Sequence, residues 1–450
     1  MIGATQGTGE KRVSETTNED IGQLAPITRG QITAAVMGNA LEFYDFTTYA
    51  LFAVQIGQTF FPADDSPFKK LMLALMAFGI GFVGRPVGAI VLGRFGDRVG
   101  RRPAMLVSFG LMGVGLLGLV LTPSYAAIGW AAPVLLLIFR LIQGFALGGE
   151  VGPTTAFLIE AAPLHKRGLI GSWQSASQAV ASLVGATVAL YMSMTLSPGQ
   201  METFGWRIAF GLGAVVLPFG LYLRRALPET LHREEAPLEI HPTTHGPFSH
   251  ARPLLLGLAM IMSFTTSTYV LLYMTTFASQ TLHMSPTDSF GASVANGACG
   301  LVFALLGGAL SDRFGRKPVM ISARTLFLLA IFPAFTLIIR NHDAVTLIVA
   351  TGVLSALSST SVGVALVSLT ESLRKDVRST GMAIVYAIGV AVFGGIVQPV
   401  VTYVIKATGS PMAPAWYLMG AAAIGIAAMA LMRETTPARI TDARALIETG

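Results

Sequence analysis

Several ionisable side chains interrupt long apolar stretches of the sequence. Glu42 and Asp45 lie three residues apart and Asn39 precedes them by one turn, so a helix would place all three on one face. Arg85 and Arg140 interrupt two later apolar stretches. Burial and a neighbouring like charge favour proton uptake by a carboxylate, and an arginine can hold a carboxylate by two parallel hydrogen bonds. The pattern predicts a site for protons and an anion, with Glu42 and Asp45 as the proton-coupling pair.

Polar residues near Arg140 extend this candidate site. Gln143 and Gly144 fall on the same helical stripe as Arg140, and Glu150 lies toward its edge as a third proton-coupling candidate. The glycine leaves room beside the two polar side chains. A purely structural pairing of Arg140 with a carboxylate stays open, and Arg85 suits either a substrate cavity or a gate.

Two further helical faces carry polar residues suited to carboxylate or hydroxyl recognition. One face has Gln174, Ser177 and Gln178, and another has Thr265, Tyr269 and Tyr273 at intervals of four. The alternative for both faces is hydrogen bonding that only joins helices. For Arg324, about two turns inside the ninth apolar stretch, we expect a side chain that reaches toward lipid headgroups.

The composition shows what kind of element must position these residues. Apolar residues make up 53% of the 450-residue chain and charged residues 12%, against about 25% charged residues in soluble proteins. The mean hydropathy is +0.64. These values exclude a soluble enzyme or a nucleic-acid-binding protein, and the net charge of +6 arises from short basic clusters between apolar stretches.

The apolar stretches are long enough to cross a membrane, which takes about 20 residues as a helix. We predict twelve spans, the fourth of them kinked near Pro153. They are 31–59, 70–92, 103–122, 131–162, 169–193, 206–226, 252–279, 288–310, 318–339, 344–371, 380–405 and 414–432.

The distribution of basic residues predicts the orientation. If both termini are cytoplasmic, most of the 30 Lys and Arg residues fall on the cytoplasmic side, as the positive-inside rule requires. The opposite side receives Lys69, Lys70, Arg207, Arg340 and Lys406. We expect a disordered tail over 1–28, six-helix halves over 29–227 and 252–432, a linker over 228–251 and a second tail over 433–450.

One loop sequence occurs twice, 215 residues apart. GRFGDRVGRRP at 93–103 follows the second predicted span, and GALSDRFGRKP at 308–318 follows the eighth. Parallel repeats of this kind place a substrate site between the halves and alternate its access by rocking. We expect the repeated loops to act as cytoplasmic gates, with glycines that allow close helix approach. Their candidate gate residues are Gly93, Asp97, Arg98, Gly100, Arg101, Arg102, Asp312, Arg313, Gly315 and Arg316.

Two acidic residues near the ends of the fourth and tenth predicted spans complete the gate hypothesis. Glu160 precedes Arg167, and Glu371 precedes Arg378. Their matched placement in the two halves predicts gate ion pairs that lie away from the substrate.

The doubled loop resembles that of the major facilitator superfamily, and the resemblance covers nearly the whole chain. Four other segments resemble its metabolite–proton symporter branch. They are GNALEFYDF at 38–46, RPVGAI at 85–90, RLIQGFALGGE at 140–150 and GWRI at 205–208. Within that branch, SWQSASQ at 172–178 and AVFGG at 391–395 look most like citrate–proton symporters.

The resemblance implies an all-α polytopic membrane protein with twelve transmembrane helices in two six-helix halves, the major facilitator fold. It also implies proton-coupled uptake of a small organic acid, citrate first, through the bacterial inner membrane. Related carriers of α-ketoglutarate, shikimate or proline/betaine share most of these motifs and remain alternatives. The fifth predicted span lacks the Gly-Pro-x-x-x-Gly-Gly pattern of drug antiporters. A transporter-like sensor is the alternative outside transport.

Other chemistry finds little support in the sequence. A Walker loop is missing, so we expect no ATP site. The single Cys299 and the scattered histidines predict neither a disulfide nor a metal site. The spans lack a nucleophile–base pair, so we expect no enzyme activity and no cofactor. The expected partners are protons, a small organic anion and the lipid bilayer, with no nucleic acid, and we expect a monomer.

Overall fold

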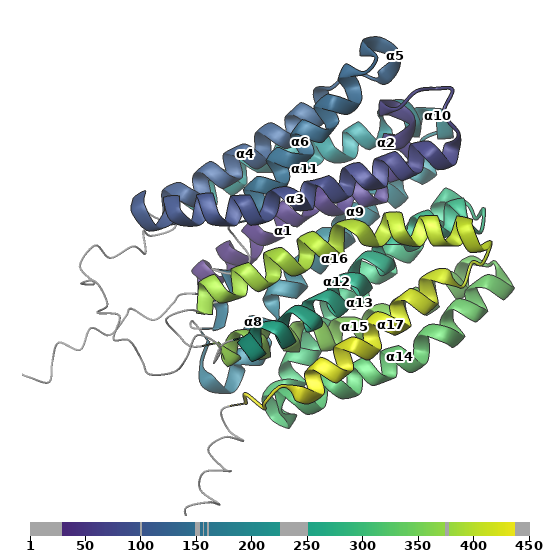
Figure 1. The fold of residues 1–450 in the computed structure, drawn as a ribbon. Coiled ribbons are helices and arrows are strands. Elements are labelled where there is room, and N and C mark those ends of the chain that lie inside the picture. The colour runs from purple at the N-terminus through teal and green to yellow at the C-terminus, as the bar shows by residue number, and fades with distance from the viewer. Residues whose placement is uncertain are drawn as a thin grey trace, which may run out of the picture.

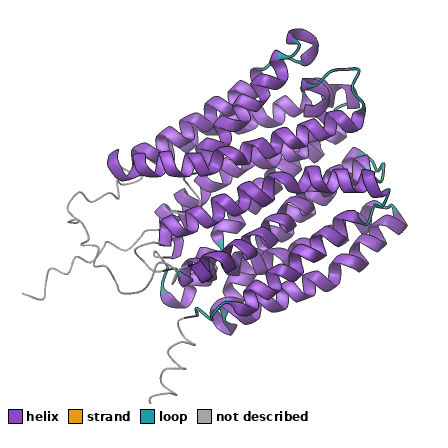
Figure 2. Ribbon diagram, viewed as in Figure 1, coloured by secondary structure: helices purple, strands orange, loops and turns teal. Residues whose placement is uncertain are grey.

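The computed structural model describes residues 29–99, 101–148, 154–155, 157–159, 162–225, 251–373 and 378–436, with some helix side chains omitted. All the regular elements in these ranges are helices, joined by short loops (Figure 2). The all-α prediction is therefore confirmed.

The first group of helices runs to residue 225. The first span is interrupted at Phe52, which separates α1 from α2, and a short π-helical segment, η2, leads into α11. The elements are α1 (Arg29–Leu51), α2 (Ala53–Phe60), α3 (Pro67–Val99), α4 (Arg101–Leu121), α5 (Tyr125–Ile128), α6 (Ala131–Leu147), η1 (Leu164–Lys166), α8 (Arg167–Gly171), α9 (Trp173–Thr195), α10 (Pro198–Gln200), η2 (Met201–Gly205) and α11 (Trp206–Arg225).

The second group consists of six long helices with short connections. Ser285 caps α13 by accepting a hydrogen bond from the Asp288 amide, and Asp343 caps α15 in the same way from Thr346. The helices are α12 (Ala251–Gln280), α13 (Pro286–Phe314), α14 (Arg316–Asn341), α15 (Ala344–Ser372), α16 (Arg378–Thr408) and α17 (Ala413–Leu431).

Counting α1 with α2, α8 with α9 and η2 with α11, the described residues form the predicted twelve spans. Eight of their helices meet a strict test of length and hydropathy for crossing a membrane, and Leu106–Leu121 and Ala131–Leu147 are shorter apolar helices. Large apolar side chains such as Val215, Leu329 and Val345 lie exposed on the outside of the bundle, where lipid would cover them. The predicted kink near Pro153 lies outside the described residues.

The two groups of helices pack side by side as two halves (Figure 1). The pairs that join the halves are α3 with α16, α9 with α13, and, less extensively, α1 with α12. Small residues make this approach close. A Cβ built on Gly79 would lie 2.5 Å from the carbonyl oxygen of Gly395, and one on Gly297 would lie 2.5 Å from the amide nitrogen of Leu183.

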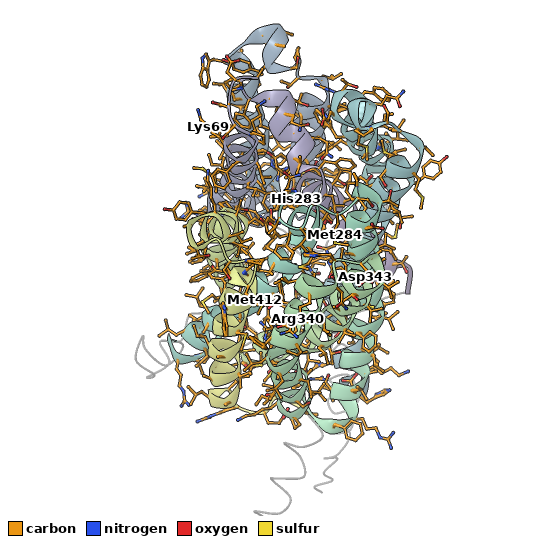
Figure 3. All side chains as sticks on the ribbon, turned by 90° about the vertical axis from the view of Figure 1, so that its right-hand side faces the viewer. Lys69, His283, Met284, Arg340, Asp343 and Met412 are labelled. Atoms are coloured by element: carbon orange, nitrogen blue, oxygen red, sulfur yellow. The ribbon has the colours of Figure 1, made fainter. Side chains whose placement is uncertain are left out.

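The bundle has two ends, which we name by what lies there. At the terminal face, α1 begins, α17 ends and α8 lies; at the far face lie α5 and α10 (Figure 1). Figure 3 views the far face, on which Lys69, His283, Arg340 and Asp343 are labelled. Lys69 and Arg340 belong to the small group assigned to the side opposite the termini.

The halves touch near both ends. At the far face the Lys406 ammonium lies 3.6 Å from the centre of the Phe68 ring. The hydroxyl groups of Ser193 and Thr287 are 3.4 Å apart. At the terminal face, α8 of the first half packs on α13 of the second. The two halves are thus in contact at both ends of the bundle.

Candidate functional site

A buried ion pair joins α1 and α6 inside the first half. The Arg140 Nη1 atom lies 3.5 Å from Asp45 Oδ2 and donates a 2.6 Å hydrogen bond to Gln143 Oε1. All three side chains are buried. Gln143 lies one turn from Arg140 on the same helix, as its spacing predicts, so it orients the guanidinium toward Asp45.

Aromatic rings surround the two buried arginines. The Arg140 guanidinium carbon lies 4.2 Å from the Tyr49 ring centre and 4.7 Å from that of Phe46. The Arg85 guanidinium carbon lies 4.5 Å from the Phe46 ring centre and 4.4 Å from that of Phe82. The face of an aromatic ring attracts a cation. Phe46 therefore contacts both charges and helps to hold them.

Several buried donors of these arginines have no hydrogen-bond partner among the described residues: the Nε and Nη2 atoms of Arg85 and of Arg140. Arg85 interacts instead with the phenol groups of Tyr269 and Tyr386, which come from the second half. Buried polar groups usually have partners. The unused donors give the site spare capacity to bind an anion at the junction of the halves.

Some of the predicted polar residues on α1 and α9 bond to one another, and others lie apart from this contact. Asn39 donates a 2.6 Å hydrogen bond to Ser177 Oγ, and Gln174 donates one of 3.1 Å to Asn39 Oδ1. This reciprocal bonding joins α1 to α9. Glu42 is buried on the same helix, and Gln178 interacts with Tyr386 of the second half.

A central cavity of about 100 Å³ lies between the halves. Phe46 and Gln178 line it from the first half, and Tyr269, Asn296 and Ser358 line it from the second. Arg85 and Arg140 do not line this cavity, but two of its lining residues contact them: Phe46 contacts both guanidinium groups, and Tyr269 interacts with Arg85. The cavity is thus linked to the two buried arginines through aromatic side chains.

The structure places the remaining predicted site residues less centrally. Tyr273 is buried, and its hydroxyl oxygen accepts a 2.8 Å hydrogen bond from Thr402. Thr265 is buried on the same helix. Glu150 lies outside the described residues. The expectation that Arg324 reaches the headgroups is wrong: its side chain is fully buried and its guanidinium binds serines on α12.

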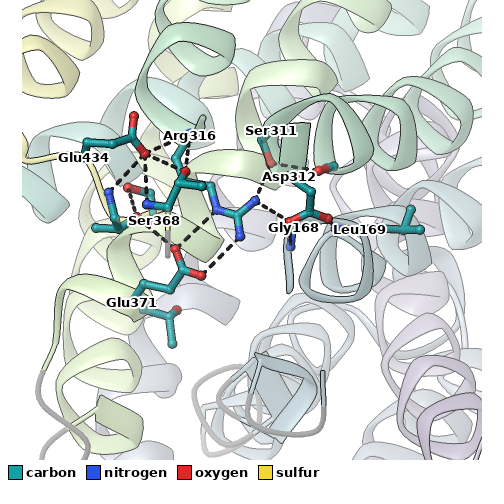
Figure 4. A network of polar contacts seen from close by, with 12 residues as sticks. Gly168, Leu169, Ser311, Asp312, Arg316, Ser368, Glu371 and Glu434 are labelled. Carbon is teal, nitrogen blue, oxygen red and sulfur yellow. Dashed lines mark hydrogen bonds and ion pairs between the residues drawn. The ribbon is translucent and has the colours of Figure 1, made fainter. Parts of the chain in front are cut away.

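A second polar cluster, drawn in Figure 4, joins the halves at the terminal face. The Asp312 carboxylate accepts hydrogen bonds from the backbone amides of Gly168 (2.7 Å) and Leu169 (2.9 Å), at the start of α8. Arg316 donates to Asp312 (2.7 Å) and forms a bidentate pair with Glu371, at 3.2 and 3.3 Å. The second copy of the repeated loop therefore binds the first half directly.

The two glycines of this copy play different parts. Gly315, with a φ of +101°, separates α13 from α14, a backbone conformation that glycine adopts at little cost. Gly308 packs on Gly168, because a Cβ on either would lie 2.5 Å from the carbonyl oxygen of the other. Gly93 is the counterpart of Gly308 in the first copy. The expectation that it allows close approach of two helices is wrong for this structure, because a Cβ on Gly93 would meet no described atom within 4 Å.

The other predicted gate residues are only partly described. Arg98 and Arg313 are exposed, and Arg167 is half-buried. Glu371 pairs with Arg316, while its predicted partner Arg378 has no described side chain. Residues without a described side chain or position are Asp97, Gly100, Arg101, Arg102 and Glu160. Their roles stay predictions.

The start of the second predicted tail takes part in this cluster, although the sequence assigned it no role. The Glu434 carboxylate accepts hydrogen bonds of 3.0 Å from the amides of Arg316 and Lys317, at the start of α14. Thr435 donates to Glu371 at 2.8 Å. Burial acts to raise the pKa of Glu434, but hydrogen bonds from Thr436 and these amides lower it below its ordinary value.

The aromatic residues around the arginines were not predicted from the sequence. Phe46, Phe78 and Phe82 pack on one another with ring centres 4.7 to 5.2 Å apart. Their signal was present, because Phe78 and Phe82 lie one turn apart on α3 and Phe46 directly follows Asp45. In a sequence with so many apolar residues, this spacing does not distinguish an aromatic ring that contacts a cation from an aromatic ring that faces lipid.

Two six-helix halves around a polar central cavity define the class of this protein as a membrane transporter. Solved structures share the fold. A D-xylose-proton symporter structure aligns with a TM-score of 0.75 at 19% identity, over 91% of this chain and 98% of that one. An inward-open structure of the xylose transporter XylE from E. coli aligns with a TM-score of 0.71, over 90% and 96%.

Sequence comparisons give the family. The profile "Sugar (and other) transporter" matches residues 31–235, and "Major Facilitator Superfamily" matches 256–447. A citrate-proton symporter of Salmonella typhi is 36% identical over 90% of this chain and 94% of its own length, and one of Klebsiella pneumoniae is 35% identical over 92% and 94%. A proline/betaine transporter of Escherichia coli is 33% identical over 90% and 84%. The chain belongs to the major facilitator superfamily, in its metabolite–proton symporter branch.

Proposed function

We propose that this transporter carries a small organic acid into the cell together with protons, and that its substrate is a di- or tricarboxylate, citrate first. The observation that carries this proposal is the Arg140–Asp45 pair, in which a long 3.5 Å contact leaves other guanidinium donors free. The named activities of the citrate-proton symporters that this chain resembles support it.

The ion pair supplies a physical link between proton and anion. While Asp45 is charged, it neutralises part of the charge of Arg140. Protonation of Asp45 removes that competition, so a substrate carboxylate binds Arg140 more tightly. By thermodynamic reciprocity, the bound anion favours protonation of Asp45 to the same degree. One proton driven by about 100 mV contributes about 2.3 kcal/mol.

The contacts between the halves suit alternating access. The proposed cycle breaks the Asp312 bonds to α8 when the site opens to the terminal face, and re-forms them when it opens to the far face. We propose that the terminal face is cytoplasmic, that the membrane is the bacterial inner membrane, and that one chain works alone. The basic residues assigned to each side support the orientation, and a central cavity lined by both halves of one chain supports a transporter that works alone.

A zwitterionic osmolyte is the second candidate, since proline/betaine transporters are 33% identical to this chain. A quaternary ammonium group would need free aromatic faces. In the described structure the rings of Phe46 and Phe82 already contact the guanidinium groups of Arg85 and Arg140. This arrangement favours an anion as the substrate.

Uptake into proteoliposomes tests the proposal. Purified protein would be assayed with labelled citrate, α-ketoglutarate, shikimate and betaine under an imposed inward proton gradient. We expect citrate to accumulate, and a protonophore to abolish the accumulation. Accumulation of betaine alone, or uptake driven only by sodium, would contradict the proposal.

A further inference from the structure

Another buried arginine lies in the second half, next to a residue that lines the cavity. Arg324 of α14 is fully buried, and its Nη2 atom donates to the hydroxyl groups of Ser263 and Ser267, both at 2.6 Å. It also donates to the Ser263 carbonyl at 2.7 Å. The guanidinium therefore binds α12 firmly through one of its nitrogens.

The charge of Arg324 has no ionic partner in the described part of the chain. No carboxylate there pairs with it, and its Nε atom has no hydrogen-bond partner. The surrounding contacts are neutral: serine oxygens and the rings of Phe264 and Phe327, with centres 5.2 and 4.7 Å from the guanidinium carbon. A buried charge is costly unless it is paired or used. Arg324 thus gives the core of the second half a positive potential.

Ser358 connects this charge to the central cavity. The Arg324 Nη1 atom lies 3.5 Å from Ser358 Oγ, and Ser358 lines the cavity between the halves. Tyr269, which interacts with Arg85, also lines that cavity. Figure 1 shows α14 and α15, which carry Arg324 and Ser358, packed together in the second half. Two lining residues of the cavity, Ser358 and Tyr269, are therefore each in contact with a buried arginine.

We propose that Ser358, with Arg324 behind it, is a second carboxylate anchor that makes the site select substrates with two or more carboxylates. This inference rests on the proposed function and specifies its substrate class. One carboxylate binds in the Arg85–Arg140 region, and a second accepts a hydrogen bond from the Ser358 hydroxyl. Arg324 is a positioning residue, because it acts through that hydroxyl and through its charge. A monocarboxylate reaches only one of the two anchors.

The rival explanation is that Arg324 only joins α12, α14 and α15. In that case substitutions would change the melting temperature and would affect all ligands equally. Under the proposal, ligands lose affinity according to their number of carboxylates. Removing the Ser358 hydroxyl separates the two explanations, because serine to alanine is a small change that keeps the helix intact.

Calorimetry on the purified full-length protein would measure citrate and glutarate affinity, with butyrate measured by competition. Ser358→Ala should raise the Kd for citrate and glutarate about tenfold, as expected for loss of a hydrogen bond to a charged group, and leave weak competition by butyrate within twofold. Ser322→Ala is the matched control, since Ser322 lies on α14 and its hydroxyl donates to the Val319 carbonyl of its own helix. It should leave all three affinities within twofold.

Two variants of Arg324 test the charge. Arg324→Gln should weaken citrate binding as much as Ser358→Ala does, and the double variant should add little further loss. Arg324→Lys keeps the charge and should recover most of the citrate affinity. Melting temperatures without ligand identify any variant that fails to fold, and Ser358→Ala then decides the question alone.

The outcomes distinguish this inference from the proposed function. If wild-type protein binds citrate and Ser358→Ala binds it within twofold as well, the second anchor is refuted while the organic-acid proposal stands. If wild-type protein binds none of the three carboxylates but binds betaine, the proposed function fails first, and the second anchor fails with it.

Discussion

Arg140 and Asp45 face each other between α6 and α1, with Nη1 3.5 Å from Oδ2 and both side chains buried. Only one of the two Asp45 oxygens makes this contact, and Oδ1 has no hydrogen-bond partner among the described residues. Because Asp45 and Arg140 are close but incompletely bonded, a substrate carboxylate can replace Asp45 as the partner of Arg140. The predictions below follow from this exchange and from the contacts that close the two ends.

Arg140 should be the main anion-binding group. A bound carboxylate gains hydrogen bonds to a charged donor, each worth about 1.5–3 kcal/mol. Lysine keeps the charge but loses the planar fork, so Arg140→Lys should weaken citrate binding at least tenfold and Arg140→Ala should nearly abolish it. Calorimetry measures both, with thermal unfolding as the control for folding. Normal citrate binding by Arg140→Ala would remove this residue from the site, and a collapsed melting temperature would give it a structural role instead.

Asp45 should couple transport to protons more directly than Glu42, because Asp45 pairs with Arg140, the proposed anion-binding group. Asp45→Asn cannot release a proton, so it should lose accumulation driven by a pH gradient and retain exchange of labelled for unlabelled citrate. Proteoliposomes allow both assays on one preparation. Glu42→Gln is the comparison. Proton-driven accumulation that survives in Asp45→Asn but disappears in Glu42→Gln would move the coupling role to Glu42.

Arg316 should control turnover more strongly than Arg313, although both belong to the repeated loop. Arg316 is buried between Asp312 and Glu371, whereas Arg313 is exposed. Arg316→Ala should reduce the maximal uptake rate at least tenfold and leave citrate affinity within a few-fold, because the residue lies at the terminal face. Arg313→Ala should stay within twofold of wild type. Equal effects of the two substitutions on the rate would refute this assignment.

Glu434 should stabilise the protein in a pH-dependent way. Its pKa is lowered in the folded state, because hydrogen bonds from Thr436 and backbone amides outweigh the effect of burial. A carboxyl group with a lowered folded pKa contributes stability above its unfolded pKa, about 4.3, and loses it as the pH falls through the folded value. Melting temperatures should therefore show Glu434→Gln less stable than wild type near pH 7, with the gap closing in acid. A gap that does not change with pH would contradict the prediction.

Close approach of the halves should require glycine at position 79. A Cβ there would lie 2.5 Å from the Gly395 carbonyl oxygen, so Gly79→Ala should slow uptake by keeping α3 and α16 apart. Gly420 is the matched control, because a Cβ on it meets no described atom. Gly420→Ala should transport at the wild-type rate. If Gly79→Ala also does, the contact between Gly79 and Gly395 is not part of the transport cycle.

Much of the fold could be predicted from the sequence. An apolar stretch of about 20 residues that crosses a membrane forms a helix, because its backbone N–H and C=O groups must hydrogen-bond to one another. Asp45, Arg85 and Arg140 could also be predicted as site residues, because charged residues are rare in such apolar stretches. Partners that lie far apart in the sequence could not be found in this way. Tyr386 and Tyr269 reach Arg85 from the other half, and Glu434 reaches Arg316 across 118 residues.

Arg324 shows why position in the sequence alone misleads. Its place about two turns from the end of a span suits a side chain that reaches the headgroups. The outcome depends on which face of α14 it occupies, and Ser263 and Ser267 of α12 occupy the facing position. Helix packing decided the direction of the side chain, and one-dimensional hydropathy carries no information about that packing.

Proton movement that accompanies citrate tests the central claim most directly. Citrate would be added outside de-energised proteoliposomes in a weakly buffered medium, while an external electrode records pH. We predict that the medium turns alkaline with wild-type protein as protons enter with citrate, and that the signal disappears with Asp45→Asn and with a protonophore. Entry of labelled citrate without any alkalinisation would contradict proton-coupled symport.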